Sequence, residues 1–230
     1  MSSGDRKLLL AGAGGFARET AEAVRAVNAV RPTWLLAGFL DDDPSMHGTS
    51  IGGVPVVGPI EAAHDHPDAE IVICTASPDA HLSRGLIADR LGLDDERYAT
   101  VVHPTATIGE SSRVGAGSVL LAHADLTADV VVGRHVAVMP QVVLTHDVRI
   151  DDCATIASGV TISGGCHVAE GAYVGTGVCL RERITVGERA MVGMGSVVTR
   201  DVPSERLWFG APARDVSRAP QPAVTSQRSA

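Results

Sequence analysis

The stretch "VVHPTATIGESSRVGAGSVL" (residues 101–120) decides the fold, because an aliphatic residue recurs in it at every sixth position. The same period continues through seventeen consecutive positions, from Val102 to Val198, without an exception. The fourth residue after each of these is restricted to Ala, Ser, Cys, Val or Ile. Helices repeat every 3.6 residues and strands every two, so neither produces a period of six. The pattern predicts a solenoid of short stacked strands, filled by the aliphatic residue and the small residue of each hexad.

Glycine often follows the aliphatic position, and the sequence predicts that these glycines ease the corners of the coil. They are Gly109, Gly115, Gly133, Gly175, Gly187 and Gly193.

The residues before the solenoid follow a different pattern, in which strand-like and helix-like segments alternate. "KLLLAG" (7–12), "WLLAGFL" (34–40) and "EIVICTA" (70–76) predict strands. Helices are predicted over residues 17–30 and roughly 79–91. This alternation predicts an α/β domain of Rossmann-like type with a parallel sheet. The predicted organisation is an α/β domain over residues 1–98, a solenoid over 99–216 and a disordered tail over 217–230.

Composition narrows the function classes. The chain has 230 residues, a net charge of −8 and no cluster of basic residues, which argues against nucleic acid or an anionic membrane as partner. Its apolar runs are too short and too interrupted for a membrane-spanning helix. No signal-peptide core precedes the first glycines, and the four cysteines show no CxxC spacing. We therefore expect reduced thiols and a cytoplasmic protein.

The six-residue period resembles that of the hexapeptide acyltransferases, whose fold is a left-handed parallel β-helix. In that family three hexads make one triangular coil of about 18 residues, so this chain is expected to have about five to six coils. The handedness is implied by the resemblance, because a period alone does not supply it. "WFGAPAR" (208–214) is similar to the closing motif of these enzymes.

Three further motifs resemble one branch of that family, the bacterial sugar O- and N-acetyltransferases that modify sialic acid or nucleotide-linked amino sugars. They are "GAGGFARE" (12–19), "FLDDD" (39–43) and "THDV" (145–148). Members similar to this chain acetylate UDP-linked 4-amino sugars. The resemblance implies acetyl-CoA as acyl donor, no metal, and a homotrimer in which the coenzyme groove forms between two subunits.

The hexad register directs His146 and Asp147 away from the core, so packing does not require them. The resemblance implies that His146 is the general base and Asp147 the adjacent acid. A neutral imidazole can take a proton from an attacking amine or hydroxyl, and a carboxylate beside it fixes its tautomer. Gly164 stands 18 residues after His146, one coil along, where the family has its oxyanion donor. The family's acyl-CoA contacts correspond to Thr155, Gly164, Thr176 and Met194.

"GAGGFA" (12–17) matches G-x-G-x-x-A between a strand and a helix, where a helix N-terminus favours phosphate. The resemblance implies a nucleotide-sugar site here, formed by Gly14, Gly15, Phe16, Asp41, Asp42 and Thr75. Two positions depart from close UDP-sugar relatives, which carry His at the place of Phe16 and Asn at the place of Met139. The sequence therefore leaves the identity of the acceptor undecided between a UDP-, GDP- or dTDP-linked sugar and a non-nucleotide amine.

Three other hypotheses compete with this one. Cys153 is a rival nucleophile for a covalent route, although no His is placed to activate it. A metalloenzyme similar to the γ-class carbonic anhydrases needs three histidines, two of them five residues apart, and the solenoid histidines here lack that spacing. A trimeric scaffold without activity would not need the His146–Asp147 pair or Gly164.

Overall fold

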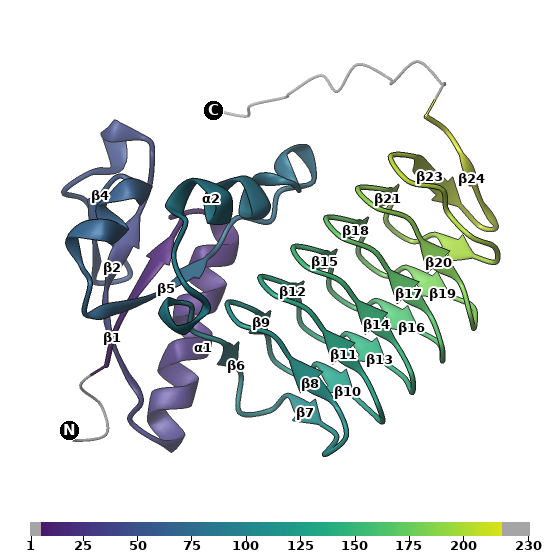
Figure 1. Ribbon diagram of the computed structural model, residues 1–230, viewed down its shortest axis with the longest axis horizontal. Coiled ribbons are helices and arrows are strands. Elements are labelled where there is room, and N and C mark those ends of the chain that lie inside the picture. Colours follow the sequence, from purple (N-terminus) through teal and green to yellow (C-terminus); the bar gives the residue numbers. More distant parts are fainter. Residues whose placement is uncertain (1–5, 218–230) are drawn as a thin grey trace.

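The computed structural model describes residues 6–217, which form an α/β domain followed by a long solenoid (Figure 1). Except for its first residue, the tail predicted over 217–230 lies outside the described residues. The α/β domain contains β1 (Arg6–Ala11), α1 (Gly15–Val30), β2 (Trp34–Leu40), β3 (Ser50–Ile51), β4 (Val54–Gly58), β5 (Ala69–Ile73) and α2 (Ser83–Leu91). Four 3₁₀ helices connect these elements at Pro44–Met46, Ile60–Asp65, Pro78–Ala80 and Asp95–Arg97.

The sheet of this domain has the strand order β3-β4-β2-β1-β5. Strands β4, β2, β1 and β5 run parallel, which confirms the predicted parallel sheet, and β3 pairs antiparallel to β4 at the edge. The sequence prediction missed β3 and β4 because both are short and Pro55 interrupts the second. The helix predicted from residue 79 begins only at Ser83, since Pro78 starts a separate 3₁₀ turn capped by Ser77.

The solenoid is built from two-residue strands, one in each hexad. They are β6 (Val101–Val102), β7 (Thr107–Ile108), β8 (Arg113–Val114), β9 (Val119–Leu120), β10 (Asp125–Leu126), β11 (Val131–Val132), β12 (Ala137–Val138), β13 (Val143–Leu144), β14 (Arg149–Ile150), β15 (Thr155–Ile156), β16 (Thr161–Ile162), β17 (His167–Val168), β18 (Tyr173–Val174), β19 (Cys179–Leu180), β20 (Thr185–Val186), β21 (Met191–Val192) and β22 (Val197–Val198). A hairpin of β23 (Leu207–Gly210) and β24 (Ala213–Asp215) closes the end.

Every third strand belongs to the same sheet, so the coil has three faces. The strand orders are β22-β19-β16-β13-β10-β7, β20-β17-β14-β11-β8 and β24-β23-β21-β18-β15-β12-β9-β6. Pairing is parallel with an offset of 18 residues, as between Asp125 and Val143. This arrangement is the predicted left-handed parallel β-helix, in which each turn of the chain stacks on the one before (Figure 1).

The interior follows the hexad pattern. Leu126, Leu144 and Ile162 at the aliphatic position are fully buried, and so is Val148 at the small position. Up to the last coil the core of the solenoid contains only aliphatic and small residues, which agrees with an aromatic content of 3%. Only at the last coil does a large ring, Trp208 of the closing hairpin, join this core. The predicted inward positions are therefore confirmed.

The corners differ from the prediction. At most corners a left-handed residue lies three places after the aliphatic residue, as at His135, Asp147 and Cys153 with φ of 53°, 59° and 58°. The glycine after the aliphatic residue has another role, because a β-carbon on Gly109 would overlap the carbonyl of Thr127 in the next coil. These glycines permit close stacking of neighbouring coils, and the assignment of their role to the turns was wrong.

The α/β domain packs on the face of the solenoid that contains β6, β9 and β12. Val101, Val119 and Ala137 point outward from these strands and are buried in one apolar cluster with residues of α1 and β1. Figure 1 shows α1 beside this face. The two domains thus share a core. Neither helix of the described residues is long and apolar enough to cross a membrane.

His135 lies at the joint between the domains. It is 2% exposed, its ring meets that of Tyr98 edge to face with centroids 4.4 Å apart, and neither ring nitrogen has a hydrogen-bond partner among residues 6–217. Burial, together with the Arg134 guanidinium, lowers the pKa of His135 to about 4. The folded protein therefore holds this imidazole neutral at pH values where an exposed histidine would be charged.

We expect this histidine to make the fold acid-sensitive. In the unfolded chain its pKa is about 6.5, so its stabilising contribution is complete above that pH and is lost as the pH falls toward 4. The loss amounts to about 3 kcal/mol at most. Urea denaturation between pH 7 and 4 measures it. His135→Asn keeps a residue that tolerates the left-handed backbone but cannot titrate, and it should flatten this part of the pH profile. An equally steep profile in the variant would contradict the assignment.

Candidate active site

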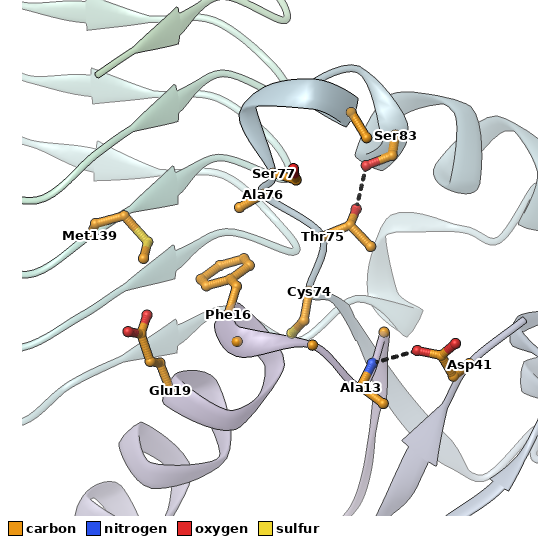
Figure 2. A pocket seen from close by; sticks show the side chains of 14 residues that line it. Ala13, Phe16, Glu19, Asp41, Cys74, Thr75, Ala76, Ser77, Ser83 and Met139 are labelled. Atoms are coloured by element: carbon orange, nitrogen blue, oxygen red, sulfur yellow. Dashed lines mark hydrogen bonds between the residues drawn. The ribbon is translucent and has the colours of Figure 1, made fainter. Parts of the chain in front are cut away.

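A cavity of about 580 Å³ lies between the α/β domain and the solenoid. It is called the interdomain cavity below, and Figure 2 shows its lining. The residues around it are Gly12, Ala13, Gly14, Gly15, Phe16, Glu19, Asp41, Cys74, Thr75, Ala76, Ser77, Ala80, Ser83 and Met139. Of the six residues predicted to contact the acceptor, five are in this lining and Asp42 is not. Asp42 instead accepts a hydrogen bond from the Ile60 N–H at 3.0 Å and pairs with Arg90 at 2.8 Å.

The glycine turn between β1 and α1 forms one wall of the cavity. Gly12 is required by the fold, because its φ is +111° and a β-carbon would lie 2.9 Å from the carbonyl oxygen of Cys74. Gly14 is different: a β-carbon there would have nothing within 4 Å. Gly14 also caps α1 without a side-chain hydrogen bond, and the first turn of α1 contains no acidic residue. This helix end is therefore open toward the cavity and carries uncompensated N–H groups.

Asp41 holds this turn in place. One carboxylate oxygen accepts the Ala13 N–H at 2.8 Å, and the other accepts the Asp43 N–H at 3.0 Å. The first of these bonds is drawn in Figure 2. Across the cavity, the Ser83 hydroxyl donates to the Thr75 hydroxyl at 2.7 Å. Asp41 and Thr75 thus line the cavity, but both side chains are also engaged in holding its walls.

The His–Asp pair is at a corner of the solenoid, in the turn between β13 and β14. The Nδ1 atom of His146 is 2.8 Å from a carboxylate oxygen of Asp147, so Nδ1–H donates to the carboxylate and Nε2 is the nitrogen available to accept a proton. Both side chains are about two-thirds exposed. Gly164 of the next coil lies directly against the imidazole, as the 18-residue spacing predicts. The pair lines neither the interdomain cavity nor the second cavity described below.

A Gly164→Ala substitution tests the contact between these neighbouring coils. A β-carbon at position 164 would overlap the His146 ring, so the imidazole must leave its place beside Asp147. Gly164 is not in the left-handed region, so the backbone tolerates alanine and the fold should persist. The resemblance implies that His146 is the base, and on that expectation kcat should fall about 10²-fold with a melting temperature close to wild type. Unchanged turnover would show that the contact is not needed.

A second cavity, of about 350 Å³, lies further along the solenoid beside β18 and β21 and is called the solenoid cavity. It is lined by Pro78, Tyr173, Gly175, Thr176, Met191, Val192, Gly193, Met194 and Leu207. Two of the predicted acyl-CoA contacts, Thr176 and Met194, are therefore together here, and Met194 is 67% exposed. Thr155 is apart from them: it is 2% exposed and its hydroxyl accepts a hydrogen bond from Arg84 at 2.6 Å. Its burial does not support the predicted coenzyme contact.

Comparison with known proteins places this geometry in a family. Residues 129–164 match the family model described as bacterial transferase hexapeptide (six repeats). The acetyltransferase domain of PglB from Neisseria gonorrhoeae is 30% identical, with 92% of this chain and 100% of that domain aligned and a TM-score of 0.81. The chain belongs to the hexapeptide-repeat acyltransferases. The predicted enzyme class and the predicted amino-sugar acetyltransferase branch are confirmed.

Further matches share the whole architecture. The same Neisseria domain in complex with acetyl coenzyme A is 29% identical over 93% of this chain and 100% of that domain, with a TM-score of 0.82. PerB from Caulobacter crescentus, in complex with CoA and GDP-perosamine, is 27% identical over 94% of this chain and 99% of its own, with a TM-score of 0.79. No curated protein sequence matches this acyltransferase significantly.

The buried thiols of Cys153 and Cys74 are poor nucleophiles. Burial raises the pKa of Cys153 to about 11 and that of Cys74, which lines the interdomain cavity, to about 12. Cys153 is 8% exposed and packs beside Gly85, where a β-carbon would lie 3.5 Å from its sulfur. A thiol with a raised pKa stays protonated near neutral pH and does not attack a thioester. The environment of Cys153 therefore argues against the covalent route.

Sequence reasoning missed several residues at or near this site. His167 and Asp151 form a second His–carboxylate contact, 2.6 Å apart, whose carboxylate is shared with Arg149. The two residues are 16 positions apart, close to the length of one 18-residue coil, and this spacing could have indicated the contact. Glu19 in the cavity lining was also missed, although it stands one helical turn after Phe16. Within residues 6–217 no three His, Cys, Asp or Glu side chains are grouped as metal ligands.

Proposed function

We propose that this acyltransferase transfers the acetyl group of acetyl-CoA to the amine of a nucleotide-linked amino sugar that occupies the interdomain cavity. The observation that carries the proposal is the lining of this cavity, which gathers five of the six predicted acceptor residues at the open end of α1. The matched Neisseria and Caulobacter proteins support it, since they were crystallised with acetyl coenzyme A and with CoA plus GDP-perosamine.

The open end of α1 suits the phosphates of such an acceptor. Its first N–H groups have no side-chain cap, and the helix dipole favours an anion there. Gly14 and Gly15 leave the approach free, because a β-carbon at Gly15 would meet only Arg18 Nη2, at 4.0 Å. Arg18 makes no ion pair with another described residue, so its guanidinium is available beside the turn. We assign the diphosphate to this end of the cavity.

His146 is proposed as the general base. Its Nδ1–H is held by Asp147, so Nε2 faces the reaction as a neutral acceptor and the carboxylate stabilises the imidazolium once it forms. The neutral amine R–NH₂ attacks the thioester carbonyl of CH₃CO–SCoA, and Nε2 takes one N–H proton. The oxyanion is held by the Gly164 N–H, the C–S bond breaks, and the proton passes to the leaving thiolate. The products are R–NH–COCH₃ and HSCoA.

A second copy of the chain is proposed to complete the site. The His146–Asp147 pair is two-thirds exposed and lines neither cavity, whereas acyl transfer needs donor, acceptor and base within contact distance. Neighbouring copies in a homotrimer would bring the corner of one solenoid to the cavities of another. Burying the pair in such an interface would also exclude water from the thioester.

Calorimetric titration tests the proposal. The protein is titrated with acetyl-CoA and then with GDP-, UDP- and dTDP-linked 4-amino sugars, and its mass is measured by light scattering. We expect acetyl-CoA and one nucleotide class to bind, with the mass of a trimer. Acetyl-CoA binding without any nucleotide sugar would indicate a non-nucleotide amine, which would agree with the absence of Lys and Arg from the cavity lining. Failure of acetyl-CoA to bind would overturn the proposal.

A further inference from the structure

One end of the interdomain cavity, where α1 meets the solenoid, has a composition unlike the rest. Figure 2 shows the carboxylate of Glu19 directed toward the space between the Phe16 ring and the Met139 side chain. Phe16 is 8% exposed and Met139 is partly buried in the same apolar cluster, so both are fixed walls. This place is called the Glu19 end below. Asp41 and the glycine turn lie at the opposite end (Figure 2).

The charges in the cavity are all acidic. Glu19 and Asp41 are the two carboxylates in its lining, which contains no Lys, Arg or His. Asp41 already accepts backbone N–H bonds on both of its oxygens. Glu19 has no hydrogen bond and no ion pair within the part of the chain that the structure describes. The Glu19 carboxylate, which lies beside apolar walls, is thus able to interact with a ligand in the cavity. It attracts a cation and repels an anion.

The two ends of the cavity therefore suit oppositely charged parts of one ligand. An anion is favoured at the N-terminus of α1, and Glu19 disfavours it one turn further along the helix. With the phosphates at the glycine turn, the sugar extends toward the Glu19 end and the solenoid. The side chains of Phe16 and Met139 are apolar, so among the three side chains that define this end only Glu19 carries a strong hydrogen-bond acceptor for the sugar.

We propose that Glu19 is a specificity-determining residue, whose carboxylate binds the acceptor's amine in its protonated form and so selects an amino sugar over its hydroxyl counterpart. The inference rests on the proposed function and deepens it. An ammonium adds the attraction of an ion pair to its hydrogen bond with the carboxylate, whereas a neutral hydroxyl offers the hydrogen bond alone. The bound R–NH₃⁺ then releases one proton to water, which leaves the neutral R–NH₂ that attacks. Transfer to nitrogen rather than oxygen follows from this selection.

The helix provides a matched control. Glu22 is one turn after Glu19, but it is paired with Arg25 and does not line the cavity. Glu19→Gln keeps the size of the side chain and one accepting oxygen, but it removes the charge and replaces the other oxygen with an NH₂ donor. Glu22→Gln makes the same chemical change outside the cavity. Both positions are on the solvent-exposed side of α1, so neither variant should impair folding.

The experiment measures binding of GDP-perosamine, and of UDP- and dTDP-linked 4-amino sugars, each beside the same sugar nucleotide carrying a hydroxyl in place of the amine. For the amino sugar that binds wild type, Glu19→Gln should raise Kd about 10- to 100-fold. Binding of the hydroxyl counterpart and of acetyl-CoA should stay within about twofold, and Glu22→Gln should behave as wild type. In wild type the preference for the amine should weaken as the pH rises through the amine's own pKa, and this dependence should be absent from Glu19→Gln.

Three results would overturn the inference, and they are distinguishable. If Glu19→Gln binds the amino sugar as tightly as wild type does, Glu19 does not select the amine, while the proposed function stands. If wild type binds none of the three amino-sugar nucleotides, the proposed function fails and the role of Glu19 fails with it. An equal loss of affinity for the amine and the hydroxyl compound would also contradict charge recognition, since it would indicate a general change in the cavity.

Discussion

The His146→Ala variant is expected to lose about 10²–10⁴-fold in kcat, the usual contribution of a general base. The reason is the geometry of the pair: Asp147 holds Nδ1 at 2.8 Å, which leaves Nε2 as the proton acceptor. Alanine removes the acceptor and does not disturb the core, because the side chain is 67% exposed. Affinity for acetyl-CoA, measured by calorimetry, should be unchanged, so the loss appears in turnover and not in donor binding.

The control for this variant is His167→Ala. His167 is also a solenoid histidine in contact with a carboxylate, Asp151 at 2.6 Å, but that carboxylate is shared with Arg149. Its removal should leave kcat within about twofold of wild type. Steady-state assays of both variants with the acceptor identified by titration make the comparison. A wild-type rate in His146→Ala, or an equal loss in both variants, would remove His146 as the base.

The solenoid could be predicted almost completely from the sequence because its core is local and periodic. Each inward residue, such as Leu144, packs on its equivalents 18 residues away, so one rule repeated along the chain fixes the fold. The role of the glycines could not be obtained in this way. The period marks Gly109 as special, but only the three-dimensional stacking shows that the next coil excludes a β-carbon there.

The candidate site was predicted less completely, because part of it depends on how the two domains meet. The glycine turn and the His146–Asp147 pair are visible as short motifs. The burial of Thr155 is not, since Thr155 has an outward position in its hexad and is covered by Arg84 of α2, 71 residues earlier. Glu19 was missed for a similar reason: an exposed position on a helix is ordinary for a glutamate, and only the packing of the two domains puts Glu19 in the same cavity lining as Met139.

Arg84 is the residue whose loss should destabilise this protein most. It is 1% exposed, and its guanidinium donates to the carbonyls of Thr75, His135, Cys153 and Ala154 and to the Thr155 hydroxyl. Burial lowers its pKa to about 10, so it stays charged at neutral pH. One side chain of α2 thus ties a wall of the interdomain cavity to two coils of the solenoid, and its five hydrogen bonds offset the desolvation of the charge.

We therefore expect Arg84→Ala to lower the free energy of unfolding by about 3–5 kcal/mol, because buried carbonyls lose their donor and a cavity opens. Arg84→Met, which refills most of the volume, should recover only part of this loss if the hydrogen bonds dominate. Arg90→Ala on the same helix removes exposed ion pairs to Asp42 and Glu61 and should cost less than about 1 kcal/mol. Denaturant unfolding compares the three. Full recovery in Arg84→Met would mean that Arg84 acts by filling space, and the interdomain cavity would then owe its shape to packing instead of hydrogen bonding.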